Sequence, residues 1–261
     1  MREVLTRAIA GGILAIFVSF IARRTRTLSM SGAIAAAVVA TLSIAAGWSW
    51  GILLLSFFAT ATALSKMGER RKAELVGPVI QQGIERNARQ VLANGGVLAL
   101  SAVGYLVVPL PIWYATGVGA LAASAADTWA TEVGTLAGGE PVSIVSAKRV
   151  PRGTSGGVTL LGTAASAGGA LFIASVATLA SWPVPFAAVA VGGIAGSLAD
   201  SVVGAILQDR RWCDQCAQST ERLAHSCGAT TRHTGGIVGL DNDGVNAICS
   251  GVGALVALLM S

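Results

Sequence analysis

The chain has 261 residues, of which 53% are hydrophobic and only 12% are charged, and its formal net charge is +5. A soluble domain carries about 25% charged residues. The low share of charge and a mean hydropathy of +0.69 argue against a water-soluble globular protein, a disordered protein and a nucleic-acid-binding domain. The chain is predicted to be an integral membrane protein. Its basic residues lie in loops between apolar segments, so the pI near 9.4 is attributed to membrane topology and no nucleic-acid partner is expected.

A helix that spans a bilayer needs roughly 20 mostly apolar residues, and about eight such segments follow one another along the chain. Three of the gaps between them are so short that the flanking segments must pair as antiparallel hairpins. The predicted fold is an all-α, polytopic transmembrane helical bundle of about eight helices, with no soluble domain. It forms a single integral membrane domain over residues 1–261. The expected segments are Val4–Ala22, Ser29–Ala46, Trp48–Ser65, Ala88–Val108, Pro111–Ala130, Gly156–Ser181, Val184–Gln208 and Asp241–Met260.

Lys and Arg residues are concentrated in alternate loops. All but two of the 18 lie in the loops that follow the first, third, fifth and seventh segments, and the exceptions, Arg2 and Arg7, lie at the N-terminus. The positive-inside rule then predicts that these four loops are cytoplasmic and that both termini face outside. The first segment lacks a small-residue cleavage site, so it is expected to be a retained helix of the cell (plasma) membrane rather than a signal peptide.

Polar side chains form a stripe on each of four predicted helices, and two of the stripes contain a carboxylate inside an apolar run. Burying a carboxylate in lipid is costly and usually functional, whereas hydroxyl groups alone more often bond helices together. Most of these stripes lie toward the cytoplasmic ends of their helices, so we expect one site open to the cytoplasm. The stripes are Ser124, Asp127, Thr128, Thr131 and Glu132; Ser197, Asp200 and Ser201; Asn87, Gln90, Asn94 and Ser101; and Asp241, Asn242, Asp243, Asn246 and Ser250.

The predicted cytoplasmic loop over residues 143–157 reads SIVSAKRVPRGTSGG. Exposed N–H groups at a helix N-terminus bind anions, and nearby cations add to the attraction. A basic loop is expected from topology alone, but carboxylates for Mg²⁺ and cations for phosphates are together the two halves of a phosphoryl-transfer site. The residues expected to bind phosphate are Lys148, Arg149, Arg152, Gly153, Thr154, Ser155, Gly156 and Gly157.

A cluster of metal-binding residue types occupies the last predicted cytoplasmic loop, residues 209–240. Cys213, Cys216, His225 and Cys227 form a Cys₃His set that suits a structural zinc ion. Cysteines on the cytoplasmic side should be reduced, so disulfides are not expected. Loose thiols or a redox pair are the alternative interpretation.

Taken together, several of these stretches resemble the membrane family catalogued as domain of unknown function 92, which includes the plant phytyl-phosphate kinase of tocopherol synthesis. The similarity covers nearly the whole chain from about Lys66 onward. It implies transfer of a phosphoryl group from CTP to an isoprenyl monophosphate, giving the diphosphate. The stretches that carry it are SKMGERRKAELVG, RQVLANGG, ASAADTWATEVG, KRVPRGTSGG, SLADSVVGAILQ, the CxxC…HxC loop and LDNDGVN.

This resemblance gives the polar residues hypothetical roles. Asp127, Glu132 and Asp200 are assigned to catalysis through Mg²⁺ and the triphosphate, and Lys66 and Arg89 to the acceptor phosphate. The expected partners are CTP, with ATP as the other candidate donor, an isoprenyl monophosphate lipid and the membrane. A transporter or scramblase of anionic isoprenoid lipids, and a membrane cytidylyltransferase, are the alternatives. The remaining nucleotide or phosphate contacts are expected from Asn94, Ser201, Asp243 and Asn246.

Overall fold

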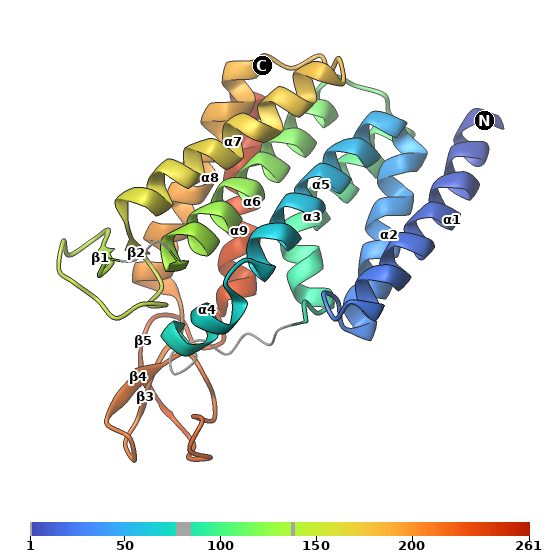
Figure 1. Ribbon diagram of the computed structural model, residues 1–261. Helices are drawn as coiled ribbons and strands as arrows, with labels where there is room; N and C mark the ends of the chain where they lie inside the picture. Colours follow the sequence, from blue (N-terminus) through green and yellow to red (C-terminus); the bar gives the residue numbers. More distant parts are fainter. Residues whose placement is uncertain (1, 77–84, 137–138) are drawn as a thin grey trace.

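The computed structural model describes residues 2–76, 85–136 and 139–261. Within these ranges the chain forms eight long α-helices and one short one, which confirms the predicted all-α bundle (Figure 1). Ordinary capping explains where several helices begin: Thr159, for example, accepts a hydrogen bond from Gly162 N just before α7. The helices are α1 (Arg2–Arg24), α2 (Met30–Ala46), α3 (Trp48–Lys66), α4 (Glu69–Val76), α5 (Ala88–Val107), α6 (Ile112–Leu136), α7 (Leu160–Leu179), α8 (Phe186–Leu207) and α9 (Asn242–Leu259).

The observed helices differ from the expected segments in three places. Helix α6 continues six residues beyond Ala130, because the side chains that end the apolar run, such as Thr131 and Glu132, do not break a helix. Helix α7 begins at Leu160 rather than Gly156, since the preceding glycine-rich stretch forms a strand and turns. The short α4 was not expected, because its sequence ERRKAELV is too short and too charged to register as a membrane span.

Six of the described helices are long and apolar enough to cross a membrane. Helix α2 has 17 residues, and α6 is interrupted by its polar stripe, so neither meets the same measure. Large apolar side chains cover the outer surface, as on α1, where Leu5, Ile13 and Phe17 are each more than 60% exposed. Such a surface suits contact with lipid rather than water. The chain is an integral membrane protein.

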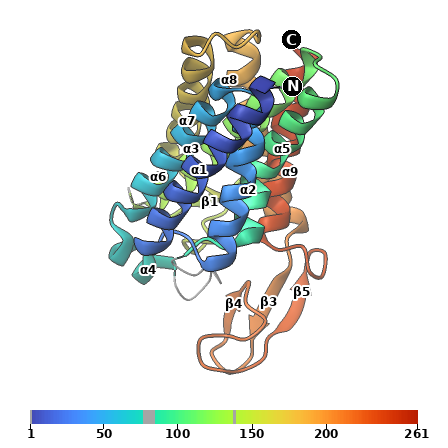
Figure 2. The ribbon, with the colours of Figure 1, turned by 90° about the vertical axis from the view of Figure 1, so that its right-hand side faces the viewer.

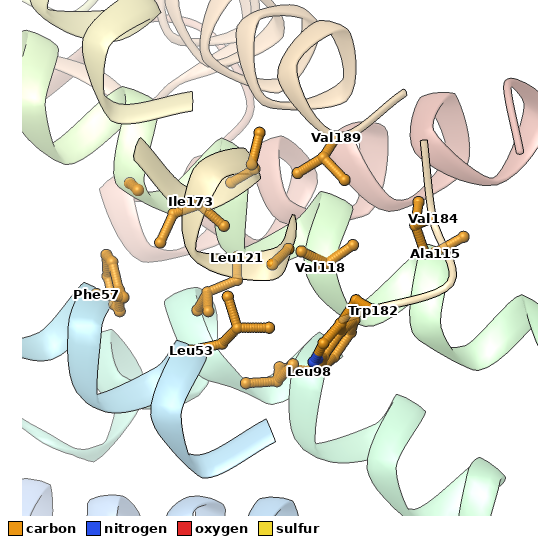
Figure 3. Close-up of a cluster of buried hydrophobic side chains, with 14 of the residues drawn as sticks. Leu53, Phe57, Leu98, Ala115, Val118, Leu121, Ile173, Trp182, Val184 and Val189 are labelled. Carbon is orange, nitrogen blue, oxygen red and sulfur yellow. The ribbon is translucent and has the colours of Figure 1, made fainter. Parts of the chain in front are cut away.

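The core lies where α3, α5, α6, α7 and α8 meet (Figure 3). Leu53, Leu98, Leu121 and Ile173 are fully buried there. An aromatic cluster closes the core at one end: the ring of Trp50 lies 4.7 Å from that of Trp182 and 5.3 Å from that of Tyr114. Such ring contacts contribute beyond their buried area. This cluster ties the ends of α3, α5 and α6 to the turn between α7 and α8.

Glycines allow α6, α8 and α9 to pack closely. A Cβ at Gly196 of α8 would lie 2.4 Å from Ala123 Cβ and 2.7 Å from Cys249 O, distances that no real side chain occupies. A Cβ at Gly119 of α6 would likewise lie 2.4 Å from Gly253 O. Small residues permit this close backbone approach between membrane helices. The close packing fixes α6 and α8 relative to each other one to two turns from Asp127 and Asp200.

The strands and the short helix α4 all lie at one end of the bundle, and both chain termini lie at the other end (Figures 1 and 2). We call the former end the loop face. This arrangement agrees with the alternation of basic loops in the sequence. Strands β1 and β2 pair antiparallel, and β3 pairs antiparallel with β4 on one side and β5 on the other. The strands are β1 (Val142–Ser143), β2 (Gly157–Val158), β3 (Arg210–Cys213), β4 (Gln218–Thr220) and β5 (Arg232–Gly235).

Candidate phosphate and metal site

Two carboxylates meet in a cavity at the loop face. Asp127 of α6 and Asp200 of α8 interact with each other and line the same cavity, which has a volume of about 150 Å³. The Oδ1 atom of Asp200 is buried and has no hydrogen-bond partner in the described part of the chain. A buried polar atom without a partner is costly. Two adjacent carboxylates with such an atom are suited to a hard cation such as Mg²⁺, which takes oxygen ligands.

The serines one turn before these acids have a different task. Ser124 donates to Asn94 O at 3.0 Å and lies 2.9 Å from Ser250 Oγ, which links α6 to α5 and α9. Ser197 Oγ accepts from Ser166 Oγ at 2.9 Å, linking α8 to α7. These hydroxyls therefore hold helices together, as hydroxyls commonly do in membrane bundles.

The glycine-rich loop closes the cavity from the side of β2. All six residues from Arg152 to Gly157, which were predicted to bind phosphate, line the cavity. Gly153 and Gly156 have φ angles of +82° and +76°, which favour glycine. A Cβ at Gly156 would lie 2.4 Å from Ala205 Cβ and 2.6 Å from Ser201 O, so the loop rests directly on α8. This contact brings a cation and backbone groups to the two acids.

A third acid, Glu221, enters the cavity from the sheet formed by β3, β4 and β5. Its carboxylate lies beside Ser155 and Gln208, whose polar groups lower its pKa, but burial outweighs them and raises the pKa of Glu221 to about 7. Ser155 Oγ also donates to Gln208 Oε1 at 2.5 Å. Glu221 is not predictable from the sequence pattern, because it lies in a polar loop among other charged residues and has no distinguishing spacing. Only the packing of the sheet against the loop shows its place.

The cations of the loop are divided between the cavity and the surface. Arg152 lines the cavity. Lys148 and Arg149 are exposed in the turn between β1 and β2, and Arg149 Nη1 donates to Glu140 Oε2 at 2.8 Å. Exposed pairs of this kind contribute little stability. Of the three cations predicted to bind phosphate from this loop, the structure thus brings only Arg152 to the carboxylates.

Glu132, assigned to catalysis from the sequence, lies apart from this cavity. Its carboxylate accepts from Ser65 Oγ at 2.7 Å and forms an ion pair with Lys72 of α4, and both partners of the pair are largely buried. Glu132 points from α6 toward α3 and α4, whereas Asp127 points toward α8. Five residues on a helix differ in direction by more than a quarter-turn, which explains why proximity in sequence did not bring the two acids together.

The remaining predicted contacts are spread over the loop face. Arg89 pairs with Asp241 at 2.7 Å and lies 3.9 Å from Asp243, while Lys66 reaches Thr25 O at 3.5 Å. Ser201 lines the cavity and is joined there by Asn242, which had no assigned role. Three other predicted contacts are not among the described residues that line the cavity: Asn94, Asp243 and Asn246.

The cysteines and histidine of the 209–240 loop form a compact cluster. One potential ligand atom from each of Cys213, Cys216, His225 and Cys227 lies within 4.8 Å of all the others. The Sγ atoms of Cys213 and Cys227 are 3.7 Å apart. Four ligands about 2.3 Å from a tetrahedral zinc ion have sulfur atoms about 3.8 Å apart. A hydrogen bond from the Ala229 backbone and the His225 ring lower the pKa of Cys227 to about 6, which favours the metal-binding thiolate.

Comparison with known proteins identifies the family. The family described as "Integral membrane protein DUF92" matches residues 13–254, and the chain belongs to it. The chain is 32% identical to "Protein PGR" of Arabidopsis thaliana over 93% of this chain and 92% of that protein. It is 30% identical to an uncharacterized membrane protein of Methanocaldococcus jannaschii over 79% of this chain and 85% of that protein.

A third relative is "Protein VTE6, chloroplastic" of Arabidopsis thaliana, which is 29% identical over 89% of this chain and 65% of that protein. No solved structure matches the chain. The family membership establishes an integral membrane protein, and it confirms the resemblance stated from the sequence motifs.

Proposed function

We propose that this member of the DUF92 family is a prenyl-phosphate kinase that transfers the γ-phosphoryl group of CTP to an isoprenyl monophosphate such as phytyl phosphate. The observation that carries the proposal is the meeting of Asp127 and Asp200 with the 152–157 loop in one cavity. It is supported by membership in a family that includes the plant phytyl-phosphate kinase. Paired carboxylates beside a cationic, glycine-rich loop are the elements that phosphoryl transfer requires.

In this reaction an oxygen of the acceptor phosphate forms a bond to the γ-phosphorus of CTP. The bond from that phosphorus to the β–γ bridging oxygen breaks, and CDP leaves. A phosphate monoester is largely ionised at neutral pH, since its second pKa is about 6. No strong general base is therefore needed, and catalysis consists of positioning the two phosphates and neutralising their charge.

The chain's own residues divide these tasks. Asp127 and Asp200 would hold Mg²⁺, which when bound neutralises the charge of the triphosphate. The unpartnered Oδ1 atom of Asp200 is an available ligand for it. Arg152 would pair with a phosphate oxygen, and the backbone N–H groups of Gly153 and Gly156 would add to that contact. Glu221, through its contact with Ser155, holds the loop against α8 and acts as a positioning residue.

The test is a product assay. Detergent-purified protein is incubated with Mg²⁺, radiolabelled CTP or ATP, and phytyl or geranylgeranyl monophosphate, and the products are separated by chromatography. We expect labelled prenyl diphosphate from the wild type and from Asp214→Asn, whose carboxylate is exposed and lies in the Cys/His sheet. We expect none from Asp127→Asn. A CDP-linked lipid would instead identify a cytidylyltransferase. No turnover by folded protein would favour a lipid transporter or scramblase, which flux measurements in liposomes would test.

We also propose that the Cys/His cluster binds one structural Zn²⁺. The short sheet that carries the cluster buries little apolar surface, and small modules of this kind usually depend on a bound metal ion or disulfides for their stability. Metal analysis of purified protein should give about one zinc per chain. Cys213→Ser should lose it, while Cys249→Ala, whose thiol lies in α9 outside the cluster, should keep it. Equal zinc content in both variants would contradict the assignment.

For the orientation we propose that the loop face, and with it the site, is cytoplasmic, with the protein in the cell (plasma) membrane. The concentration of Lys and Arg in the loops of this face supports the proposal. A membrane-impermeant thiol reagent applied to intact cells should spare a cysteine introduced by Ser146→Cys, a position that is exposed on this face and lies outside the Cys/His cluster, and should label it after the cells are opened. Labelling in intact cells would show that the loop face lies outside the cell and would contradict the proposed orientation.

A further inference from the structure

Helices α1, α2, α3 and α5 enclose an apolar groove of about 170 Å³. Among the described residues, it shares no lining side chain with the carboxylate cavity. Its walls include Leu14, Trp48, Ile52 and Leu55, each about half exposed at the surface of the bundle. Because that surface is the lipid-facing one, the groove opens sideways into the membrane.

The end of this groove near the loop face is polar. Gln90 and Asn94 line it from one side of α5, four residues apart, and Arg86 lines it from just before the helix begins. The rest of the lining is almost entirely hydrocarbon. A groove with a long apolar wall and one basic, amide-bearing end complements a hydrocarbon chain with an anionic head.

The backbone of Arg86 is held firmly at this position. Its N–H donates to Thr27 O at 3.0 Å, and its carbonyl accepts from Ser29 N at 3.0 Å. A Cβ at Gly32 would lie 2.1 Å from Arg86 O, so only glycine permits this approach. These backbone contacts do not depend on the side chain of Arg86, which leaves that side chain free for another role.

The guanidinium group of Arg86 forms no ion pair with any residue that the structure describes. Its Nη2 donates to Ala61 O at 3.4 Å, and no described carboxylate lies within ion-pair distance of it. Residues 77–84, which precede it, contain no acidic residue. Glu132 attracts Arg86 electrostatically, but its carboxylate is already paired with Lys72 and hydrogen-bonded to Ser65. Burial lowers the pKa of Arg86, yet a guanidinium stays charged in proteins. Arg86 is only partly exposed, and a charge that is largely removed from water without an ion-pair partner is costly.

We propose that this groove binds an anionic membrane phospholipid, with one acyl chain along the apolar wall and the phosphate paired with Arg86. The guanidinium supplies the charge and the forked donors that a phosphate accepts. The sideways opening admits a lipid from the bilayer. The separation from the carboxylate cavity favours a bound membrane lipid over the phosphorylated substrate. This inference does not rest on the proposed kinase activity.

The experiment measures which lipids remain with the protein. Wild-type protein is reconstituted with equal amounts of phosphatidylglycerol and phosphatidylcholine, extracted into mild detergent and analysed for bound lipid by mass spectrometry. We expect phosphatidylglycerol to be enriched in the wild type, and the enrichment to fall about tenfold in Arg86→Gln, because charge-assisted hydrogen bonds are lost. Arg86→Lys should recover part of it. Ala40→Phe, which fills the groove, should reduce the binding of both lipids.

The matched control is Arg24→Gln. Arg24 also lies near the loop face, but its guanidinium stacks 5.1 Å from the centre of the Phe20 ring and does not line the groove. This variant should keep the wild-type enrichment. Equal enrichment in wild type and Arg86→Gln, or an equal loss in Arg24→Gln, would overturn the proposal. Displacement of phosphatidylglycerol by an equimolar amount of geranylgeranyl monophosphate would also overturn it and assign the groove to the substrate lipid.

Discussion

The two halves of the bundle are built on opposite packing principles. In one half, α6, α8 and α9 approach so closely through glycines that a single methyl group would not fit at Gly119 or Gly196. In the other, α1, α2, α3 and α5 leave an apolar groove between them. Close packing makes positions rigid, since packed interiors do not deform continuously. The tight half can therefore hold two acids at a fixed separation, and the open half can accommodate hydrocarbon.

Loss of a carboxylate from the tight half should have the largest effect. Asp200→Asn removes one of the two carboxylates assigned to Mg²⁺, and we expect transfer to fall by about 10²–10³-fold, the usual effect of losing one electrostatic contact to the reacting groups. Initial rates of diphosphate formation measure this. Glu132→Gln should retain transfer within about threefold, because Glu132 lies outside the cavity; an equal loss in both variants would place Glu132 in the reaction.

The same Glu132→Gln variant should be unstable, because it leaves Lys72 buried without its carboxylate partner. We expect a cost of about 2–3 kcal/mol in the free energy of unfolding, as for other broken buried pairs. Glu140→Gln is the matched control, since it breaks an exposed pair with Arg149 and should cost less than about 1 kcal/mol. Denaturant titration in detergent compares the two. Equal costs would show that burial of the Lys72 pair has no energetic consequence.

A single methyl group added to each of two glycines tests the close packing directly. Gly196→Ala should destabilise the protein by about 1–3 kcal/mol, because the new methyl overlaps Ala123 and the α9 backbone. Gly251→Ala, on α9, meets no atom within 4 Å and should be neutral or slightly stabilising, since alanine favours helix. The unfolding midpoint of each variant is compared with that of the wild type. Equal stability of the two variants would mean that α8 can move away from α6 and α9 without a loss in the free energy of unfolding.

The smallest expected effect is a pH dependence from Glu221. Its pKa is raised from 4.5 to about 7 in the folded protein, so the folded state binds a proton that the unfolded state has released. Stability should therefore fall as the pH rises from about 5 to about 8, by about 2.5 kcal/mol at most and by less in practice, because Glu221 is partly exposed and solvent screens its charge. Glu221→Gln should remove this part of the pH dependence. Unfolding midpoints in Mg²⁺-free buffer measure it, and an unchanged pH profile in the variant would refute it.

The sequence by itself determined the membrane bundle, the approximate helix bounds, the common face of the basic loops, the pair Asp127 and Asp200, and the composition of the Cys/His cluster. These depend on hydropathy, charge and spacing, which are local properties of the chain. The tertiary structure alone decided that Glu132 pairs with Lys72 and that Asn94 faces the apolar groove. It also placed Glu221 in the cavity and Arg86 at the polar end of the groove, where none of the described carboxylates forms an ion pair with it. Spacing along a chain cannot show which neighbour a helix face or a distant loop will meet, because that depends on how the helices pack.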